Sequence, residues 1–196
     1  AVEGGDQVHV SYLPIGTVLG VMPWNFPLWQ VIRAAGPIML SGNGFLLKHA
    51  PNVMGSAHAL ERPFADAGFP RGIFANVSAD NAAVARVIED PRIAAVTLTG
   101  SMRAGAAVAG IAGRALKKSL LELGGSDAFI VLADANIDLA VKAAIEARFQ
   151  NTGQVCLAAK RFILERPIAE AFTAQFVAAA RALKLGDPLD PATDIG

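Results

Sequence analysis

Three side chains that lie far apart in this sequence carry the groups that covalent chemistry at a carbonyl carbon requires. Cys156, the only cysteine, follows the small polar run Asn151-Thr-Gly-Gln154 and is a candidate nucleophile. Glu122 is a candidate general base, and the glycines at 124 and 125 leave room beside it for a ligand. Asn25 would donate from its amide to the oxyanion of a tetrahedral adduct, and losing one such donor costs about 10²–10³ in rate. A thiol, a base and an amide donor are the groups needed to oxidise an aldehyde through a thioester.

Each of these residues also has a purely structural interpretation. A lone cysteine is commonly a buried, unreactive side chain, a glutamate at a strand end commonly faces solvent, and an asparagine commonly stabilises its own turn. The polar residues before Cys156 instead favour a loop that leads into a helix, where backbone N–H groups stabilise a thiolate. A thiol hydrolase would need a histidine partner, but His9, His49 and His58 show no spacing that indicates this role.

Short β-rich runs alternate with longer helical patterns, which predicts an α/β fold with parallel strand pairing. The expected strands are Val18–Val21, Gly44–Lys48, Gly72–Val77, Ala94–Leu98, Lys117–Leu121, Ala128–Leu132 and Arg161–Leu164. The expected helices are Leu28–Leu40, Val53–Ala67, Asn81–Glu89, Arg103–Ile111, Leu139–Phe149 and Ile168–Ala182. Pro63 is predicted to kink or break the second helix. The paired glycines at 124 and 125 suit a hinge between domains at 1–123 and 124–196.

The composition excludes several classes of function. The 17 basic and 17 acidic residues balance, so no electrostatic basis for binding nucleic acid or an anionic membrane is present. The sequence has no uncharged apolar run of roughly 18 residues and no basic leader at its start. A single cysteine cannot form an internal disulfide, which fits a reducing compartment. We therefore expect a soluble, cytoplasmic protein without a metal site. The start at Ala1 and the polar end at 190–196 suggest a piece of a longer polypeptide.

Four motifs, in their order and spacing, resemble the aldehyde dehydrogenase superfamily. They are Met22-Pro-Trp-Asn-Phe-Pro27, Leu98-Thr-Gly-Ser101, Leu121-Glu-Leu-Gly-Gly125 and Asn151-Thr-Gly-Gln-Val-Cys156. The resemblance covers essentially the whole chain and corresponds to the middle of a longer family chain. It implies Cys156 as the nucleophile, Glu122 as the general base, and Asn25 with the Cys156 backbone N–H as the oxyanion hole. An acylating relative that passes its thioester to coenzyme A would share this scaffold, but Glu122 favours hydrolysis.

The same resemblance implies a nicotinamide cofactor, either NADP or NAD. It assigns Lys48 to the adenosine ribose and Ser101 to the pyrophosphate, and a helix N-terminus at Ser101 would supply N–H donors. Further implied cofactor contacts are Met22, Pro23, Trp24 and Leu123. It also implies that 1–123 is part of a cofactor-binding domain with a Rossmann-like parallel sheet and flanking helices. Residues 124–196 would begin a second α/β catalytic domain, so that the aldehyde dehydrogenase fold is incomplete.

One departure from the family pattern bears on the choice of cofactor. NAD-preferring members often carry a glutamate three residues after the lysine, whereas this chain has Pro51 there. Without that acid, the 2′-phosphate of NADP meets no charge repulsion, and Lys48 or His49 would favour it. We therefore expect NADP to be accepted.

The residues assigned to substrate binding are Arg33, which follows Asn25 by eight residues, and Trp29, which lies one helical turn before Arg33 on the same face. An arginine at this spacing grips the substrate carboxylate in succinate-semialdehyde dehydrogenases, and a guanidinium suits a carboxylate. The runs at 47–52, 90–96 and 101–107 also resemble a bacterial branch of those enzymes. Some relatives carry a second arginine where this chain has Gln150, although Arg148 is nearby.

The sequence leaves alternatives open beside succinate semialdehyde. Another ω-carboxylated aldehyde or a general aldehyde would use the same chemistry, and a truncated chain would keep the fold without turning over. In the full-length protein we expect a homo-oligomer that acts on a small molecule, without a nucleic-acid or membrane partner.

Overall fold

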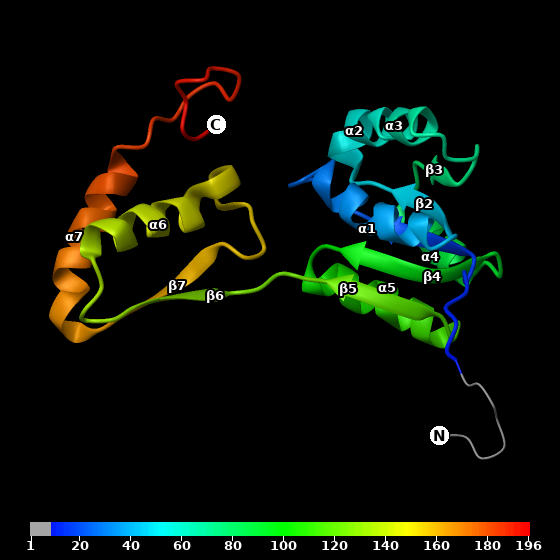
Figure 1. Cartoon of the computed structure of the whole chain (residues 1–196), viewed down its shortest axis with the longest axis horizontal. Coiled ribbons are helices and arrows are strands. Elements are labelled where there is room, and N and C mark those ends of the chain that lie inside the picture. The colour runs from blue at the N-terminus through cyan, green and yellow to red at the C-terminus, as the bar shows by residue number, and fades with distance from the viewer. Residues whose placement is uncertain (1–8) are drawn as a thin grey trace, which may run out of the picture. The chain divides into compact units, whose positions relative to one another are not determined.

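The computed structural model describes residues 9–196, which form two units (Figure 1). Each unit has its own apolar core. The first unit ends at Leu123 and the second comprises Gly124–Gly196. Within the described residues, no helix has both the length and the apolar character needed to cross a membrane.

The first unit is built on a five-stranded sheet in which all neighbouring strands are parallel. Its order is β3-β2-β1-β4-β5. The strands are β1 (Thr17–Val21), β2 (Gly44–Lys48), β3 (Phe74–Asn76), β4 (Ile93–Thr99) and β5 (Lys118–Glu122). The order reverses between β1 and β4, which is the switch point beside which ligands bind in open α/β sheets.

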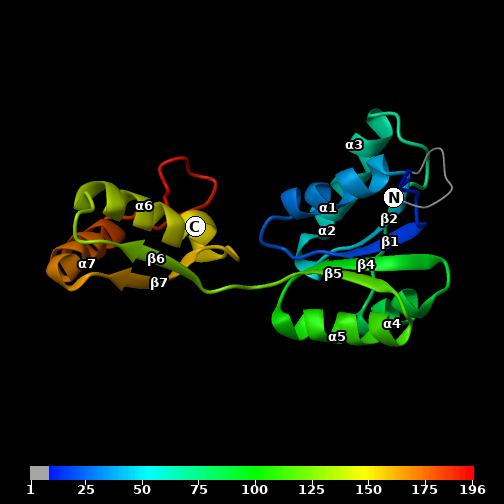
Figure 2. The same ribbon diagram turned by 60° about the horizontal axis from the view of Figure 1, so that its bottom comes forward.

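Helices cover both faces of this sheet (Figure 2). On one face lie α1 (Trp29–Leu40), the short turn η1 (Pro51–Val53), α2 (Met54–Ala59) and α3 (Glu61–Asp66), and on the other lie α4 (Asn81–Glu89) and α5 (Met102–Arg114). The two-residue period of a strand divides β4 between these layers. Val96 and Leu98 pack with α4 and α5, whereas Thr97 and Thr99 face the side of α1.

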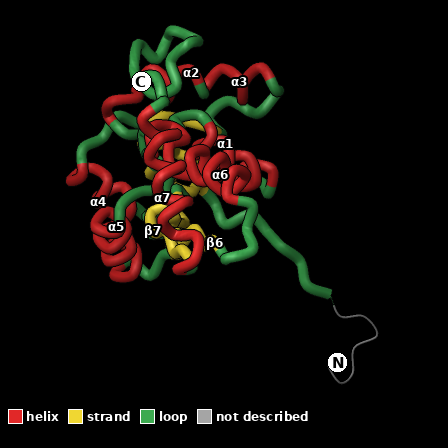
Figure 3. The backbone as a smooth tube through the Cα atoms, turned by 90° about the vertical axis from the view of Figure 1, so that its left-hand side faces the viewer, coloured by secondary structure: helices red, strands yellow, loops and turns green. Residues whose placement is uncertain are grey.

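The second unit pairs β6 (Asp127–Val131) with β7 (Ala159–Leu164) in parallel. Between these strands the chain forms α6 (Ile137–Phe149) and the short η2 (Gln150–Gly153), and α7 (Arg166–Arg181) follows β7. Figure 3 shows α6 and α7 close to the strand pair. The core of this unit contains Val131, Ala144 and Phe172, and the Phe162 ring contacts those of Phe129, Phe172 and Phe176.

Every expected strand and helix is present, with ends that differ by a few residues, and the α/β class with parallel sheets is confirmed. The predicted break of the second helix at Pro63 was misplaced. The break falls at Leu60, between α2 and α3, and Pro63 lies in the first turn of α3. A proline is tolerated there because the N–H groups of a first turn have no helical partner to lose.

Candidate active site

The site residues predicted in the first unit lie at the carboxyl ends of its parallel strands. Asn25 lies in the loop after β1, Lys48 ends β2, Ser101 follows β4 by two residues, and Glu122 ends β5. Because these strands are parallel neighbours, their carboxyl ends share one edge of the sheet. The fold thus gathers groups that are remote in sequence at the edge where such sheets bind ligands.

His49 fastens the Asn25 loop to the end of β2. The His49 side chain is buried, its Nε2 lies 2.8 Å from the carbonyl oxygen of Pro27, and its Nδ1 accepts a 2.9 Å hydrogen bond from the N–H of Ala50. Since Nδ1 is the acceptor, Nε2 carries the proton and donates to Pro27. The expectation that His49 would favour NADP is therefore wrong, because both ring nitrogens are engaged inside the protein.

The remaining predicted cofactor residues after β1 differ in exposure. The backbone N–H of Met22 donates to the carbonyl oxygen of Lys48 at 3.1 Å, and the Met22 side chain is buried in the core beside α1. Pro23 and Lys48 are half-buried, and Trp24 is exposed. Met22 could therefore contact a cofactor through its backbone but not through its buried side chain. Trp24 and Lys48, by contrast, have side-chain surface available for such a contact.

Ser101 is the N-cap of α5. Its Oγ accepts a 3.2 Å hydrogen bond from the N–H of Ala104, and a hydroxyl that accepts can still donate its proton. The first N–H groups of a helix carry partial positive charge and lack helical partners, so this helix end fits a phosphate. The Leu123 side chain packs against Gly105 of α5, where an added Cβ would lie 2.6 Å from Leu123 Cδ2. Contact between Leu123 and a cofactor would therefore involve its backbone.

Arg33 and Glu122, assigned to substrate binding and base catalysis, form an ion pair. Arg33 Nη2 donates to Glu122 Oε1 at 2.8 Å, and the two side chains are 45% and 47% exposed. Arg33 Nη1 also lies 3.5 Å from the Oε1 of buried Gln30. The pair borders a recess lined by Gln30, Arg33, Ala34, Thr97, Thr99, Leu120 and Glu122. Trp29, at the start of α1, is exposed and lies outside this lining.

Cys156 is exposed in the turn that precedes β7 of the second unit. The expectation of a loop leading into a helix is wrong, because the chain continues from this turn into a strand and α7 begins only at Arg166. A helix N-terminus therefore does not follow the thiol directly.

Lys160 anchors the turn that carries Cys156, and the sequence analysis missed it. Its Nζ donates to the carbonyl oxygens of Val155 and Cys156 at 3.2 and 2.7 Å. Gly125 approaches the same turn, since a Cβ added to it would lie 3.6 Å from the Cys156 oxygen. A lysine four residues after a cysteine follows no pattern that indicates this contact, so no sequence signal would have identified it.

The segment before Cys156 adopts an unusual backbone conformation. Asn151, Thr152 and Gly153 have φ values of 50°, 59° and 73°, and a β-branched threonine rarely enters this left-handed region. Gly153 is also packed against Arg148, whose Nη2 would lie 2.8 Å from an added Cβ. Backbone strain of this kind concentrates at functional sites, and Arg148 contacts the loop that leads to the thiol.

The fold agrees with comparisons to known proteins. The chain belongs to the aldehyde dehydrogenase family, whose model matches residues 2–196. It is 63% identical over 191 residues to the NAD(P)+ succinate semialdehyde dehydrogenase Sad of Escherichia coli strain K12, covering 97% of this chain and 41% of that protein. It is 53% identical over 193 residues to the NADP(+) succinate-semialdehyde dehydrogenase of Mycolicibacterium paratuberculosis, covering 98% and 41%.

The chain is also similar in structure to a solved enzyme of this family. The succinic semialdehyde dehydrogenase of Streptococcus pyogenes, in complex with NADP+, superposes with a TM-score of 0.91 at 41% identity. The match covers 93% of this chain and 40% of that one. The chain thus spans about two fifths of the length of the relatives it matches.

Proposed function

We propose that this chain forms part of an enzyme that oxidises succinate semialdehyde to succinate with NADP or NAD. The observation that carries the proposal is the pairing of Arg33 with Glu122 in one recess, because a carboxylate-binding group then lies beside a candidate base. The names of the two relatives above support the same substrate. Another ω-carboxylated aldehyde is the alternative, since the recess itself recognises only a carboxylate.

The proposed reaction divides between the two units. The Cys156 thiolate attacks the aldehyde carbon, a C–S bond forms, and the oxyanion accepts hydrogen bonds from the Asn25 amide and the Cys156 N–H. The hemithioacetal carbon loses a hydride and becomes a thioester. Glu122 then removes a proton from water, the hydroxide attacks the thioester, and the C–S bond breaks to give the Cys156 thiolate and the carboxylic acid, which releases its remaining proton to solvent.

The residues present fit a nicotinamide dinucleotide, which when bound supplies the two-electron acceptor for the hydride. The Ser101 hydroxyl and the N-terminus of α5 would hold the pyrophosphate, and Lys48 would reach the adenosine ribose. Pro51 offers no carboxylate to repel a 2′-phosphate, and the Streptococcus pyogenes relative was crystallised with NADP+. On this basis residues 1–123 serve as part of a cofactor-binding domain and 124–196 begin the catalytic domain.

The test uses a polypeptide of full family length that contains this sequence, hereafter the full-length protein. Arg33→Leu should lower kcat/KM for succinate semialdehyde at least about tenfold more than for butanal, because hydrogen bonds to charged groups contribute roughly 1.5–3 kcal/mol. Arg62→Leu is the matched control, since Arg62 pairs with Asp66 on the exposed surface of α3. Equal losses for the two aldehydes in Arg33→Leu would remove Arg33 from the substrate site.

A further inference from the structure

The Arg33 guanidinium is already paired with a carboxylate of the protein itself, that of Glu122. Its Nη2 donates to Glu122 Oε1 at 2.8 Å across 89 positions of sequence. The proposed function gives Arg33 the substrate carboxylate and gives Glu122 the base role. In this structure each of these groups is therefore engaged by the other.

The fold makes this pairing specific. In the parallel register of β4 and β5, Thr97 lies opposite Leu120 and Thr99 lies opposite Glu122. These four side chains line the recess on the side of α1, because alternate residues of a strand face the same side. Arg33 reaches the recess from α1, and buried Gln30 lies one turn before it.

The recess has room for a second carboxylate beside the guanidinium. Its volume is about 80 Å³, well above the roughly 10–15 Å³ that one water molecule requires. Arginine presents five N–H donors in a planar fork, and the Glu122 contact uses one nitrogen of that fork. An incoming carboxylate would bind the fork through two parallel hydrogen bonds, which is the stronger arrangement.

The existing pair is weak enough to exchange. Both side chains are close to half exposed, and ion pairs of this exposure shift an equilibrium by about fivefold at most. A substrate carboxylate at a concentration near its dissociation constant would therefore compete effectively for Arg33.

We propose that Arg33 restrains Glu122 until a substrate carboxylate takes its place and releases Glu122 to act as the base. This inference rests on the proposed function, because it uses the roles assigned there to both residues. It follows that ω-carboxylated aldehydes would be favoured by a higher kcat as well as by tighter binding. An uncharged aldehyde binds without breaking the pair, so Glu122 stays restrained in most molecules.

The decisive experiment supplies the aldehyde group and the carboxylate group of the substrate on two separate molecules. The full-length protein oxidises saturating acetaldehyde while sodium acetate is added, with sodium chloride at equal ionic strength as the control. Acetate should bind Arg33 and raise kcat about twofold to fivefold, the range that an exposed ion pair allows. Chloride should leave kcat unchanged. Inhibition by acetate, or no effect on kcat, would overturn the proposal without requiring any variant to fold.

Variants of Arg33 provide the second measurement. Arg33→Gln should have a higher kcat for acetaldehyde than the unmodified protein, by a similar twofold to fivefold, and should no longer respond to acetate. Arg62→Gln, which removes the exposed pair with Asp66, should keep the acetate response. If Arg33→Gln loses activity selectively for succinate semialdehyde but acetaldehyde turnover never rises, the substrate assignment stands and the release of Glu122 is wrong. If both aldehydes suffer equally, the proposed role of Arg33 fails, and the inference fails with it.

Discussion

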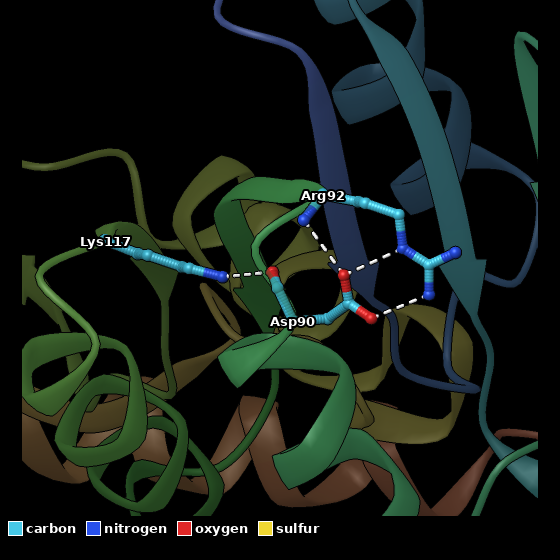
Figure 4. Close-up of polar contacts among 3 residues, drawn as sticks. All are labelled: Asp90, Arg92 and Lys117. Carbon is cyan, nitrogen blue, oxygen red and sulfur yellow. Dashed lines mark hydrogen bonds and ion pairs between the residues drawn. The ribbon is translucent and has the colours of Figure 1, made fainter.

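The two edges of the five-stranded sheet differ in how a carboxylate finds its partner. At one edge the partner is close in sequence, and at the other it is distant. At the amino ends of β4 and β5, Asp90 accepts from the N–H and Nε of Arg92 at 2.9 Å each, and from its Nη2 at 2.7 Å (Figure 4). Lys117 donates to the backbone carbonyl of Asp90 and so ties the start of β5 to the segment before β4. At the carboxyl ends, Glu122 accepts from Arg33 across 89 positions of sequence.

This difference separates a carboxylate held by its own turn from the carboxylate that we propose as the base. Hydrogen bonds from the side chain and backbone of Arg92 hold the pKa of Asp90 well below its ordinary value, so Asp90 is poorly suited to take a proton. The partner of its carboxylate, Arg92, lies only two residues away, so these contacts form with the turn itself. The Glu122 pair instead joins α1 to β5 through a half-exposed contact, which we propose that a substrate carboxylate replaces. Stability at one edge and chemistry at the other is the division that parallel α/β sheets favour.

The variant with the largest expected effect tests whether catalysis depends on the carboxyl edge of the sheet and not on the amino edge. Glu122→Gln keeps the size of the side chain but removes the base, so steady-state kcat of the full-length protein should fall about 10²–10⁴-fold. Glu89→Gln is the matched change at the opposite edge, where Glu89 is exposed at the end of α4, and should retain full activity. Steady-state NADPH production measures both. Comparable losses in the two variants would abolish the functional distinction between the edges.

The sequence was sufficient to predict this architecture because local pattern determines it. Apolar runs such as Leu46-Leu47 and Val96-Thr97-Leu98 are limited by turn residues, and every expected strand formed. The placement of Glu122 at a strand end followed from the same pattern. Its assignment as a catalytic group, like that of Asn25, came from motif resemblance and stays a prediction.

Contacts between distant segments were not predictable from the sequence. His49 follows a strand, and nothing in the neighbouring sequence indicates that its ring donates a hydrogen bond to the Pro27 carbonyl, 22 positions earlier. The Lys160 contact with the Cys156 carbonyl likewise depends on how the turn folds back on β7. The helix expected after Cys156 failed because small polar residues are common before both helices and strands.

His49 provides a second test, because it is a structural residue at the edge otherwise assigned to chemistry. Replacing it with alanine leaves the Pro27 carbonyl and the Ala50 N–H without their partner in a partly buried site, at up to about 1–3 kcal/mol for each unsatisfied group. His49→Ala should therefore lower the Tm of the full-length protein by roughly 4–10 °C. His58→Ala, on the exposed side of α2, is the control and should change Tm little. A stable His49→Ala protein would return this histidine to the list of candidate cofactor ligands.

The smallest effect concerns the amino edge and its dependence on pH. Asp90 has a lowered pKa in the folded chain, so its ionised form stabilises the fold above the unfolded value of about 4. This contribution diminishes as pH falls below about 4 and continues to do so toward the lower folded pKa. Asp90→Asn should reduce Tm at pH 7 by no more than about 3 °C, because exposed ion pairs contribute little. The difference in Tm between the two proteins should shrink between pH 5 and pH 3, with activity at pH 7 unchanged. A difference that grows on acidification would reverse the sign of the linkage, and a loss of activity would place chemistry at the edge assigned to stability.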